Sequence, residues 1–310
     1  IMILGAGGKM GPDLAVLAKK ALKSAGKKNE VIAVSRFSNK NLVKELQSEE
    51  VSVIQTDLLN QDQLASLPKV KNVFFLAGMK FGSEKDLSLT WAMNSYLPAL
   101  VAEYFKDSRI VAYSTGCVYP LVPVESGGSK ETDKPEPVGE YAQSCLGRER
   151  MFEYGSRKYG TPVALIRLNY AVEPRYGVLV DIAIKVKNNQ PVDLTMGYFN
   201  LIWQGDANNM VLRSVGHASS PALILNITGP ETLCVRDVAL EFGKLFNKEV
   251  QFTGNEAETA LLNNAEQAFR LFGKPQVSVY KVIDWTARWM DEDKKLLGKP
   301  THFEVRDGKY

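Results

Sequence analysis

Cysteine and histidine are scarce in this chain. Its 310 residues include three cysteines and two histidines. The cysteines, Cys117, Cys145 and Cys234, are an odd and sparse set, which suits neither a disulfide framework nor a CxxC metal site. We therefore expect a protein of the reducing cytoplasm that has no metal centre.

Long apolar runs and an excess of one charge are also missing. No stretch approaches the length of a membrane span and no leader opens the chain, although the apolar start at Ile1 suggests that the native N-terminus lies a few residues upstream. The net charge is +3, from 38 basic and 35 acidic residues without long runs. This balance argues against nucleic-acid or membrane surfaces and favours a small-molecule partner.

A glycine-rich turn follows the first apolar segment. Gly5, Gly8 and Gly11 are spaced three residues apart and enclose Lys9 and Met10. A flexible surface turn can have the same composition. Here, however, the turn joins a predicted strand at 1–4 to a predicted helix at 14–25, and a second strand follows at 31–34. Such a βαβ unit lets backbone amides and the positive end of the helix dipole approach a pyrophosphate.

Strand-like and helix-like segments alternate through the first half of the chain. Further strands are predicted at 51–55, 73–76, 110–113 and 163–166, with helical patterns between them. This alternation indicates an α/β fold with a parallel sheet covered on both faces. The later part predicts helices at 178–188, 207–215, 235–246 and 277–289, and strands at 198–203 and 223–227. We expect a dinucleotide-binding part, 1–168, and a smaller substrate-binding part, 169–310, whose segments can interleave.

By position 141 the chain resembles the extended short-chain dehydrogenase/reductases, in the NAD(P)-dependent sugar epimerase/dehydratase branch. The resemblance implies a Rossmann-type doubly wound sheet, and it runs nearly end to end. Its motifs are the glycine turn, Thr56-Asp57-Leu58 for adenine, Leu76-Ala77-Gly78-Met79-Lys80 beside the cofactor, Asn94 as a structural asparagine, Ser114 to Tyr119, and Tyr141 as the catalytic tyrosine.

In that family the tyrosine exchanges a proton with a sugar hydroxyl or ketone while nicotinamide takes or gives a hydride. The resemblance assigns this role to Tyr141 and makes Thr115 a hydrogen-bond partner of the same substrate oxygen. The alternative for Tyr141 is a buried structural tyrosine, and the alternative for Thr115 is a threonine at a strand end that bonds to the backbone. The family's catalytic lysine is replaced by Cys145. A neutral thiol supplies neither the charge that favours the phenolate nor the donors that hold the nicotinamide ribose.

Three interpretations of Cys145 stay open: the hydride chemistry is slow or lost, another cation has moved in, or a different acid and base are used. Lys80 and Arg148 are candidates for the second. Arg148 lies seven residues after Tyr141, about two helical turns away, so Lys80 is preferred. For the third, Ser114 to Pro120 is similar to the segment of GDP-mannose 3,5-epimerases and GDP-fucose synthases in which a cysteine is the acid/base. That cysteine is Cys117 here, and its alternative is an apolar filler at a strand end. Gly116-Cys117 in place of Asp-Glu argues against 4,6-dehydration.

Cofactor preference is predicted from the end of the second strand. Ser35 and Arg36 stand there without the acidic residue that favours NAD, and Arg36 can pair with a 2′-phosphate. NADP is the expected cofactor and NAD the alternative. The substrate half is less regular. The asparagine that the resemblance implies as a sugar-nucleotide contact corresponds to Asn169, which is one place early and is followed by Tyr170. Arg175 and Arg236 are further candidate substrate residues. Arg175 falls near the place where relatives have the partner of the acid/base cysteine, and Arg236 is a candidate phosphate contact whose alternative is a surface arginine. Asp206 is expected to cap the helix at 207–215.

These motifs predict an NAD(P)-dependent epimerase or ketone reductase that acts on a sugar or nucleotide sugar. Relatives pair two long helices into a homodimer, and the helices at 89–105 and 141–159 are expected to do the same here. The rival hypothesis is a non-catalytic dinucleotide-binding sensor that kept the glycine turn after losing its lysine.

Overall fold

The computed structural model describes residues 1–80 and 82–309. Its contacts divide the chain into two compact units, each assembled from segments that are distant in the sequence. Unit 1 contains 1–115, 140–167 and 208–225, and unit 2 contains 116–139, 168–207 and 226–310.

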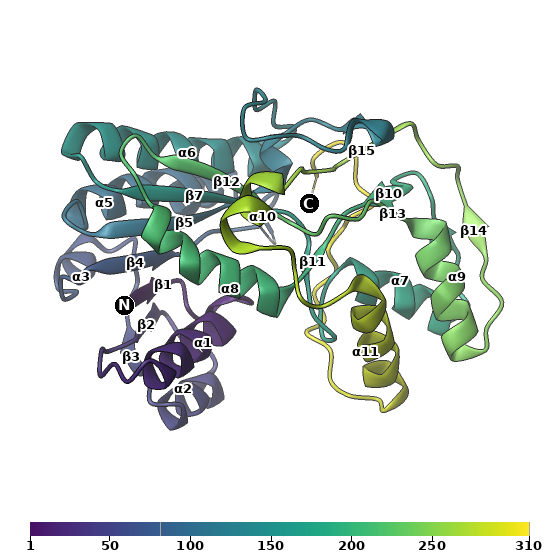
Figure 1. Ribbon diagram of the computed structural model, residues 1–310, viewed down its shortest axis with the longest axis horizontal. Coiled ribbons are helices and arrows are strands. Elements are labelled where there is room, and N and C mark those ends of the chain that lie inside the picture. Colours follow the sequence, from purple (N-terminus) through teal and green to yellow (C-terminus); the bar gives the residue numbers. More distant parts are fainter. Residues whose placement is uncertain (81, 310) are drawn as a thin grey trace. The chain divides into compact units, whose positions relative to one another are not determined.

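Unit 1 contains most of a seven-stranded sheet with the strand order β12-β7-β5-β4-β1-β2-β3. The pairs from β3 to β5 are parallel, with Met2 beside Ile32 and Val73. The expected doubly wound parallel α/β fold is confirmed, and Figure 1 shows helices on both sides of the sheet. The strands are β1 (Met2–Leu4), β2 (Ile32–Ser35), β3 (Ser52–Gln55), β4 (Asn72–Phe75), β5 (Arg109–Thr115), β7 (Val163–Leu168) and β12 (Leu223–Ile227).

Strand alternation explains one face of this sheet. Met2 and Leu4 on β1, and Val73 and Phe75 on β4, point to the same side because neighbours along a strand alternate. They join a buried apolar cluster to which the helices α3, α5 and α6 contribute residues. The helices of unit 1 are α1 (Gly11–Ser24), α2 (Lys40–Ser48), α3 (Gln61–Ala65), α4 (Leu87–Trp91), the π-helical turn η1 (Ala92–Tyr96), α5 (Leu97–Tyr104), α6 (Glu140–Tyr159), most of α8 (Gln204–Ser214), and the 3-10 turn η4 (Val215–His217).

Unit 2 packs helices α7, α9 and α11 around its own apolar cluster. On α9, Val235, Val238, Ala239 and Phe242 follow helical spacing and are buried. The helices are α7 (Val178–Lys187), α9 (Val235–Phe246), α10 (Glu266–Phe272) and α11 (Val279–Asp291), with the 3-10 turns η2 (Gly116–Val118) and η3 (Val124–Ser126). The strands are β6 (Val122–Pro123), β8 (Ala171–Val172), β9 (Val192–Asp193), β10 (Tyr198–Phe199), β11 (Ile202–Trp203), β13 (Leu233–Cys234), β14 (Phe252–Thr253) and β15 (Thr259–Ala260).

Two local predictions are corrected. The strand expected at 198–203 is two short strands, β10 and β11, which pair with different partners, β13 and β8. The prediction that Asp206 caps a helix is wrong, because α8 already begins at Gln204. Its carboxylate Oδ2 instead accepts the backbone N–H groups of Gln276 and Val277, at 3.1 and 2.9 Å. The side chain therefore fixes the chain before α11.

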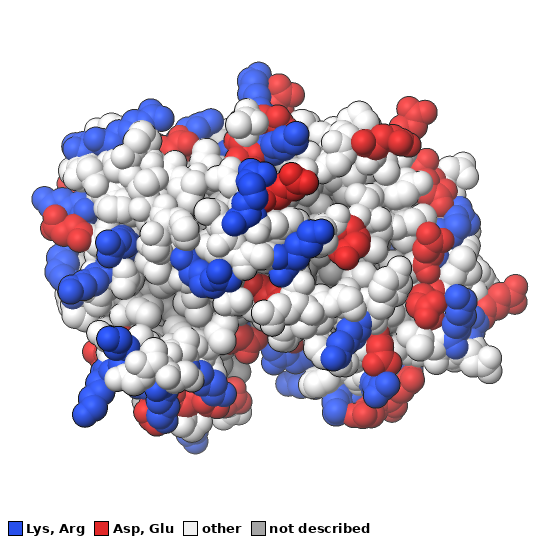
Figure 2. Space-filling model, viewed as in Figure 1, with Lys and Arg blue, Asp and Glu red and all other residues white. Residues whose placement is uncertain are grey.

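Charged side chains of both signs are scattered over the face shown in Figure 2. Within residues 1–80 and 82–309, no helix has both the length and the apolar character needed to cross a membrane. The same residues contain no group of three or more histidine, cysteine or acidic side chains placed to hold a metal ion.

Candidate active site

Steric crowding fixes the glycine turn between β1 and α1. Gly5 has a φ of +85°, and a Cβ there would lie 2.5 Å from the backbone nitrogen of Ala77. A Cβ on Gly11 would lie 2.6 Å from Ala6, and one on Gly7 would lie 2.7 Å from the Ser35 hydroxyl. At these three positions only glycine fits without a shift of its neighbours. Gly8 differs, because its nearest neighbour would be the Gly5 carbonyl oxygen at 3.4 Å.

The turn opens onto a cavity of about 470 Å³ in unit 1. Eight residues predicted to bind the cofactor line it: Gly5, Gly8, Ser35, Arg36, Leu58, Leu76, Ala77 and Gly78. Thr56, from the motif expected to face adenine, also lines the cavity. Sequence reasoning missed six others: Gly7, Phe37, Ser38, Asn39, Leu42 and Met93. Because a side chain at Gly5 or Gly7 would collide with the strand ends behind it, the backbone itself forms the wall, as a pyrophosphate cradle requires.

Lys9, Met10 and Gly11 lead from this turn into the helix. Met10 occupies the N-cap position of α1 in a helical backbone conformation, and Lys9 is partly buried. Asp57, which was expected to contact adenine, is exposed, and its Oδ1 accepts the N–H of Leu59 at 3.1 Å. Its neighbours Thr56 and Leu58 face the cavity.

The charge of the cavity wall is positive. Arg36 is exposed on the wall. Among the described residues that line the cavity, none is acidic. Phe37, which follows Arg36, has a φ of +44°. This left-handed conformation is uncommon for a bulky residue and marks a constrained position.

Asn94 holds the end of β4 in place. It is fully buried within the π-helical turn η1. Its Oδ1 accepts the Met79 N–H and its Nδ2 donates to the Met79 carbonyl, both at 2.9 Å. Nδ2 also donates to the Ser144 hydroxyl on α6 at 2.9 Å. Asn94 thus joins the segment that follows β4 to α6, and π-helical turns frequently occur at functional sites.

Tyr141 stands half-buried in the first turn of α6, and a lysine lies close to its ring. The Lys80 ammonium is 5.9 Å from the centroid of the Tyr141 ring. Thr115 is the last residue of β5 and is 8% exposed. Because α6 packs against β5, the two predicted catalytic residues come from neighbouring elements of unit 1.

Cys145 is buried one turn further along α6, at 1% exposure. It shares the buried face of the helix with Ala142, Ser144 and Arg148. Where the resemblance places an ammonium, the structure therefore has a thiol shielded from solvent.

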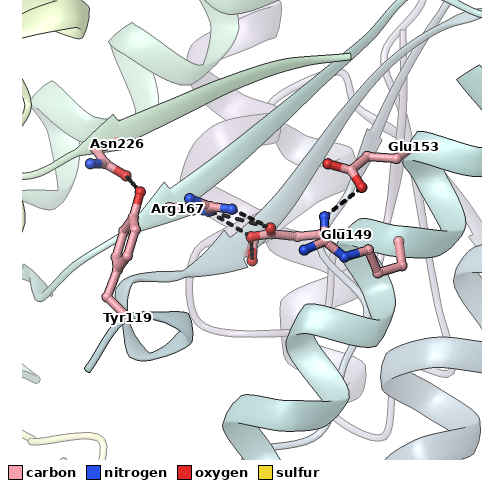
Figure 3. Close-up of polar contacts among 7 residues, drawn as sticks. Tyr119, Glu149, Glu153, Arg167 and Asn226 are labelled. Atoms are coloured by element: carbon pink, nitrogen blue, oxygen red, sulfur yellow. Dashed lines mark hydrogen bonds and ion pairs between the residues drawn. The ribbon is translucent and has the colours of Figure 1, made fainter. Parts of the chain in front are cut away.

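A buried ion pair fixes α6 on the sheet, and sequence reasoning missed it. Arg167 Nε and Nη2 donate to the two carboxylate oxygens of Glu149, at 3.0 and 2.7 Å, with both side chains at most 1% exposed. The Ser114 hydroxyl donates to the same carboxylate at 2.5 Å. Figure 3 shows the Arg167 fork facing Glu149. Bidentate geometry of this kind gives direction as well as energy, so the pair orients α6 next to the residue before Thr115.

Unit 2 contains the predicted substrate residues. Asn169 is buried and its Nδ2 donates to Asn200 Oδ1 at 2.9 Å. Tyr170 has a φ of +39°, a strained conformation for an aromatic residue. Arg175 pairs with Glu173 at 2.7 Å, and Arg236 makes two hydrogen bonds to Glu256, at 2.7 and 3.1 Å. An anionic ligand at either arginine would have to compete with a carboxylate.

Cys117 lies in the 3-10 turn η2 and is partly buried. Burial raises the pKa of Tyr170, and the nearby Cys117 adds to this increase. Burial also raises the pKa of Tyr176, with contributions from Asp181 and Cys117. A third tyrosine of unit 2, Tyr119, donates its hydroxyl to Asn226 Oδ1 at 3.0 Å (Figure 3). The thiol therefore lies near two phenols, those of Tyr170 and Tyr176, whose pKa is raised.

A family model described as the NAD dependent epimerase/dehydratase family matches residues 1–195. The chain belongs to this family. Among curated proteins, no sequence match is found.

Solved structures of the epimerase/dehydratase fold superpose along nearly the whole chain. The dTDP-glucose 4,6-dehydratase DesIV of Streptomyces venezuelae, solved with NAD bound, has a TM-score of 0.79 and 19% identity, covering 94% of this chain and 97% of its own. UDP-glucuronic acid 4-epimerase of Bacillus cereus, in complex with NAD, has a TM-score of 0.78 and 18% identity, covering 95% and 99%. Pal from Bacillus thuringiensis has a TM-score of 0.76 and 20% identity, covering 94% and 99%. At these identities the likeness establishes the fold.

The sequence has Cys145 where the family resemblance implies a lysine, and the structure buries this thiol on α6.

Proposed function

We propose that unit 1 binds a nicotinamide dinucleotide and that the protein is an epimerase or ketone reductase for a sugar or nucleotide sugar. The observation that carries this proposal is the glycine-walled cavity that ends at Gly78, two residues before the lysine that lies beside Tyr141. The structural neighbours that were solved with NAD support the choice of cofactor class.

The residues around the cavity suit a dinucleotide of the NADP type. The glycine turn would hold the pyrophosphate, and Arg36 with Ser35 would face the adenosine ribose. A cavity wall with one arginine and no carboxylate favours a 2′-phosphate. When bound, the nicotinamide supplies the redox chemistry at the sugar carbon.

Tyr141 is the proposed acid/base at the oxygen of that carbon. A neighbouring cation favours an ionised phenol, and Lys80, with its ammonium 5.9 Å from the ring centroid, is in place to provide one. Thr115 orients the substrate oxygen by a hydrogen bond. Cys117, two residues later in the chain, would exchange a proton at the neighbouring carbon if the reaction is an epimerisation. Asn169, Tyr170, Arg175 and Arg236 remain the proposed substrate contacts in unit 2.

Incubation with NADP or NAD and a panel of sugars in deuterated water tests this function. We expect reduction of a ketone or deuterium incorporation into the sugar. Tyr141→Phe is expected to lower either activity by at least about a hundredfold, because general acid/base catalysis contributes on that scale. Exchange that is lost in Cys117→Ser and survives in Cys145→Ala supports the thiol mechanism. An active Tyr141→Phe protein would contradict the proposed role of the phenol.

The rival function is a dinucleotide-binding sensor without turnover, and the buried thiol at position 145 favours it. Tight dinucleotide binding without exchange or reduction across the panel would support the sensor. Cys145→Lys separates the two functions further. A large gain in turnover would identify a weakened enzyme, whereas binding without any gain would support the sensor.

A homodimer and a cytoplasmic location complete the proposal. Apolar side chains on α4, η1 and α6 are exposed, among them Trp91 at 39%, Tyr96 at 49% and Tyr154 at 59%. Pairing of these helices with those of a second copy would cover them. Light scattering of the purified protein is expected to give twice the chain mass of 34.4 kDa, and Tyr154→Glu is expected to shift the mass to that of one chain.

A further inference from the structure

Arg148 is a buried cation without a carboxylate partner among residues 1–80 and 82–309. Its side chain is 6% exposed. Nη1 donates to the Tyr113 carbonyl at 2.8 Å, and Nη2 donates to Asn94 Oδ1 at 2.7 Å. The buried Nε has no hydrogen-bond partner in the described part of the chain. A charge buried in this way is costly, so packing alone does not account for an arginine here.

The Arg148 guanidinium lies directly against Gly78, which follows β4. A Cβ on Gly78 would lie 2.2 Å from Arg148 Nη2, and Gly78 lines the cavity. The Phe75 ring lies near the same guanidinium, with 5.6 Å between its centroid and Cζ. The backbone of Gly78 therefore separates the guanidinium from the cavity. The guanidinium lies between the segment that follows β4 and strand β5.

The two proposed catalytic residues belong to the elements that Arg148 joins. Arg148 projects from α6, which carries Tyr141, and donates to β5, which ends at Thr115. Side chains on a helix lean toward its N-terminus. The long Arg148 side chain thus carries its charge back toward the turn that contains Cys145.

We propose that Arg148 is a positioning residue that supplies the buried positive charge of the dinucleotide site, in place of the amine absent at position 145. This inference rests on the proposed function, because it requires a dinucleotide in the cavity. Arg148 acts through Gly78 and Asn94, and it shapes the electrostatic environment in which the dinucleotide binds.

A fixed cation discriminates between the two redox forms of the dinucleotide. The oxidised nicotinamide ring carries a positive charge and the reduced ring is neutral, while the rest of the molecule is the same. A cation nearby therefore favours the reduced form. At an effective permittivity of about 20, a fixed unit charge within about 10 Å of the ring would change the affinity ratio by roughly tenfold.

Equilibrium titrations with NADP+ and NADPH, and with NAD+ and NADH, test the inference. The quantity compared is the Kd of the oxidised form divided by the Kd of the reduced form. Arg148→Gln is expected to lower this ratio by roughly tenfold, and Arg148→Lys is expected to preserve it within about twofold because the charge stays. Arg150→Gln is the matched control, since Arg150 is an exposed neighbour on α6 that pairs with Glu153, and it is expected to leave the ratio unchanged.

Gly78→Ala provides a second route to the same answer. The added Cβ displaces the guanidinium from the cavity wall, so the ratio should fall as in Arg148→Gln, and this variant decides the matter if Arg148→Gln does not fold. Folded Arg148→Gln and Gly78→Ala proteins that keep the wild-type ratio would overturn the inference and leave the proposed function intact. A wild-type protein that binds none of the four dinucleotides would instead overturn the proposed function, and the inference with it.

Discussion

Arg148 and Arg167 are two buried arginines of unit 1 that have opposite electrostatic surroundings. Arg167 donates two hydrogen bonds to the Glu149 carboxylate, which also accepts the Ser114 hydroxyl. Arg148, which precedes Glu149 in the sequence, donates hydrogen bonds to neutral oxygens of Tyr113 and Asn94. Both side chains are at most 6% exposed.

The difference separates a charge that holds the fold from a charge that serves a site. A buried cation with a bidentate carboxylate satisfies its own desolvation, and loss of either partner strands the other. A buried cation that meets only neutral oxygens contributes less to folding than it costs to desolvate. Because Arg148 lies against Gly78 of the cavity wall, we assign its charge to the dinucleotide site.

The largest effect is expected from breaking the Arg167–Glu149 pair. Arg167→Met leaves the Glu149 carboxylate buried and without its cation, which costs about 3 to 5 kcal/mol. The free energy of unfolding, from urea denaturation followed by circular dichroism, checks this. A loss below about 1 kcal/mol would contradict the role of the pair as the anchor of α6.

Arg148→Met is expected to change the free energy of unfolding by no more than about 1 kcal/mol, because removal of an unpaired buried charge offsets the hydrogen bonds that are lost. The same urea titration measures it. If this variant loses as much stability as Arg167→Met, then Arg148 is part of the structural frame and the contrast between the two arginines disappears.

A partly buried carboxylate in unit 2, Asp181, extends the contrast to negative charge. Burial raises its pKa above the ordinary value of 3.8, and hydrogen bonds from Thr301 oppose the increase. The folded state therefore binds the Asp181 proton more tightly than the unfolded state does. Wild-type stability relative to Asp181→Asn should fall as the pH rises from about 3.8 through the raised pKa, and then level off.

At neutral pH we expect Asp181→Asn to be more stable than wild type by up to about 1 kcal/mol. Urea titrations between pH 4 and 7 measure the difference. Asp284→Asn, at a more exposed carboxylate that pairs with Arg288 on α11, controls for the loss of an acidic residue. We expect the free energy of unfolding of Asp181→Asn, minus that of wild type, to increase with rising pH. A decrease in this difference would contradict the prediction.

The smallest effect is expected at Arg150. Its ion pair with Glu153 is 2.7 Å long but the arginine is 50% exposed. Arg150→Gln should change the free energy of unfolding by less than about 0.5 kcal/mol, and the difference should vanish in high salt. A loss comparable to that of Arg167→Met would show that burial is not what separates these arginines.

The sequence predicted the sheet, the glycine turn and Asn94 because each depends on local pattern. Alternating apolar runs specify strands, and glycines that follow a strand specify a close backbone approach. The motif at 76–80 predicts Lys80 beside the cofactor and makes it the preferred replacement cation, and the structure has its ammonium 5.9 Å from the centroid of the Tyr141 ring.

Long-range side-chain contacts could not be predicted in the same way. Helical spacing places Arg148 about two turns from Tyr141, but it carries no information on the contact between the Arg148 side chain and Gly78. The Glu149–Arg167 pair joins residues of α6 and β7 that share no motif. Arg236 gave no sign of its carboxylate partner, Glu256, because the two are brought together by tertiary packing.

Calorimetric titration of NADPH into wild type, Gly8→Val and Gly216→Val tests the dinucleotide site most directly. A Cβ on Gly8 has no protein atom closer than 3.4 Å and Gly8 lines the cavity, whereas Gly216 has no atom within 4 Å of an added Cβ and lies away from the cavity lining. We predict that wild type and Gly216→Val bind NADPH equally and that Gly8→Val does not bind it. Absence of binding to wild type, or equal binding to Gly8→Val, would contradict the account.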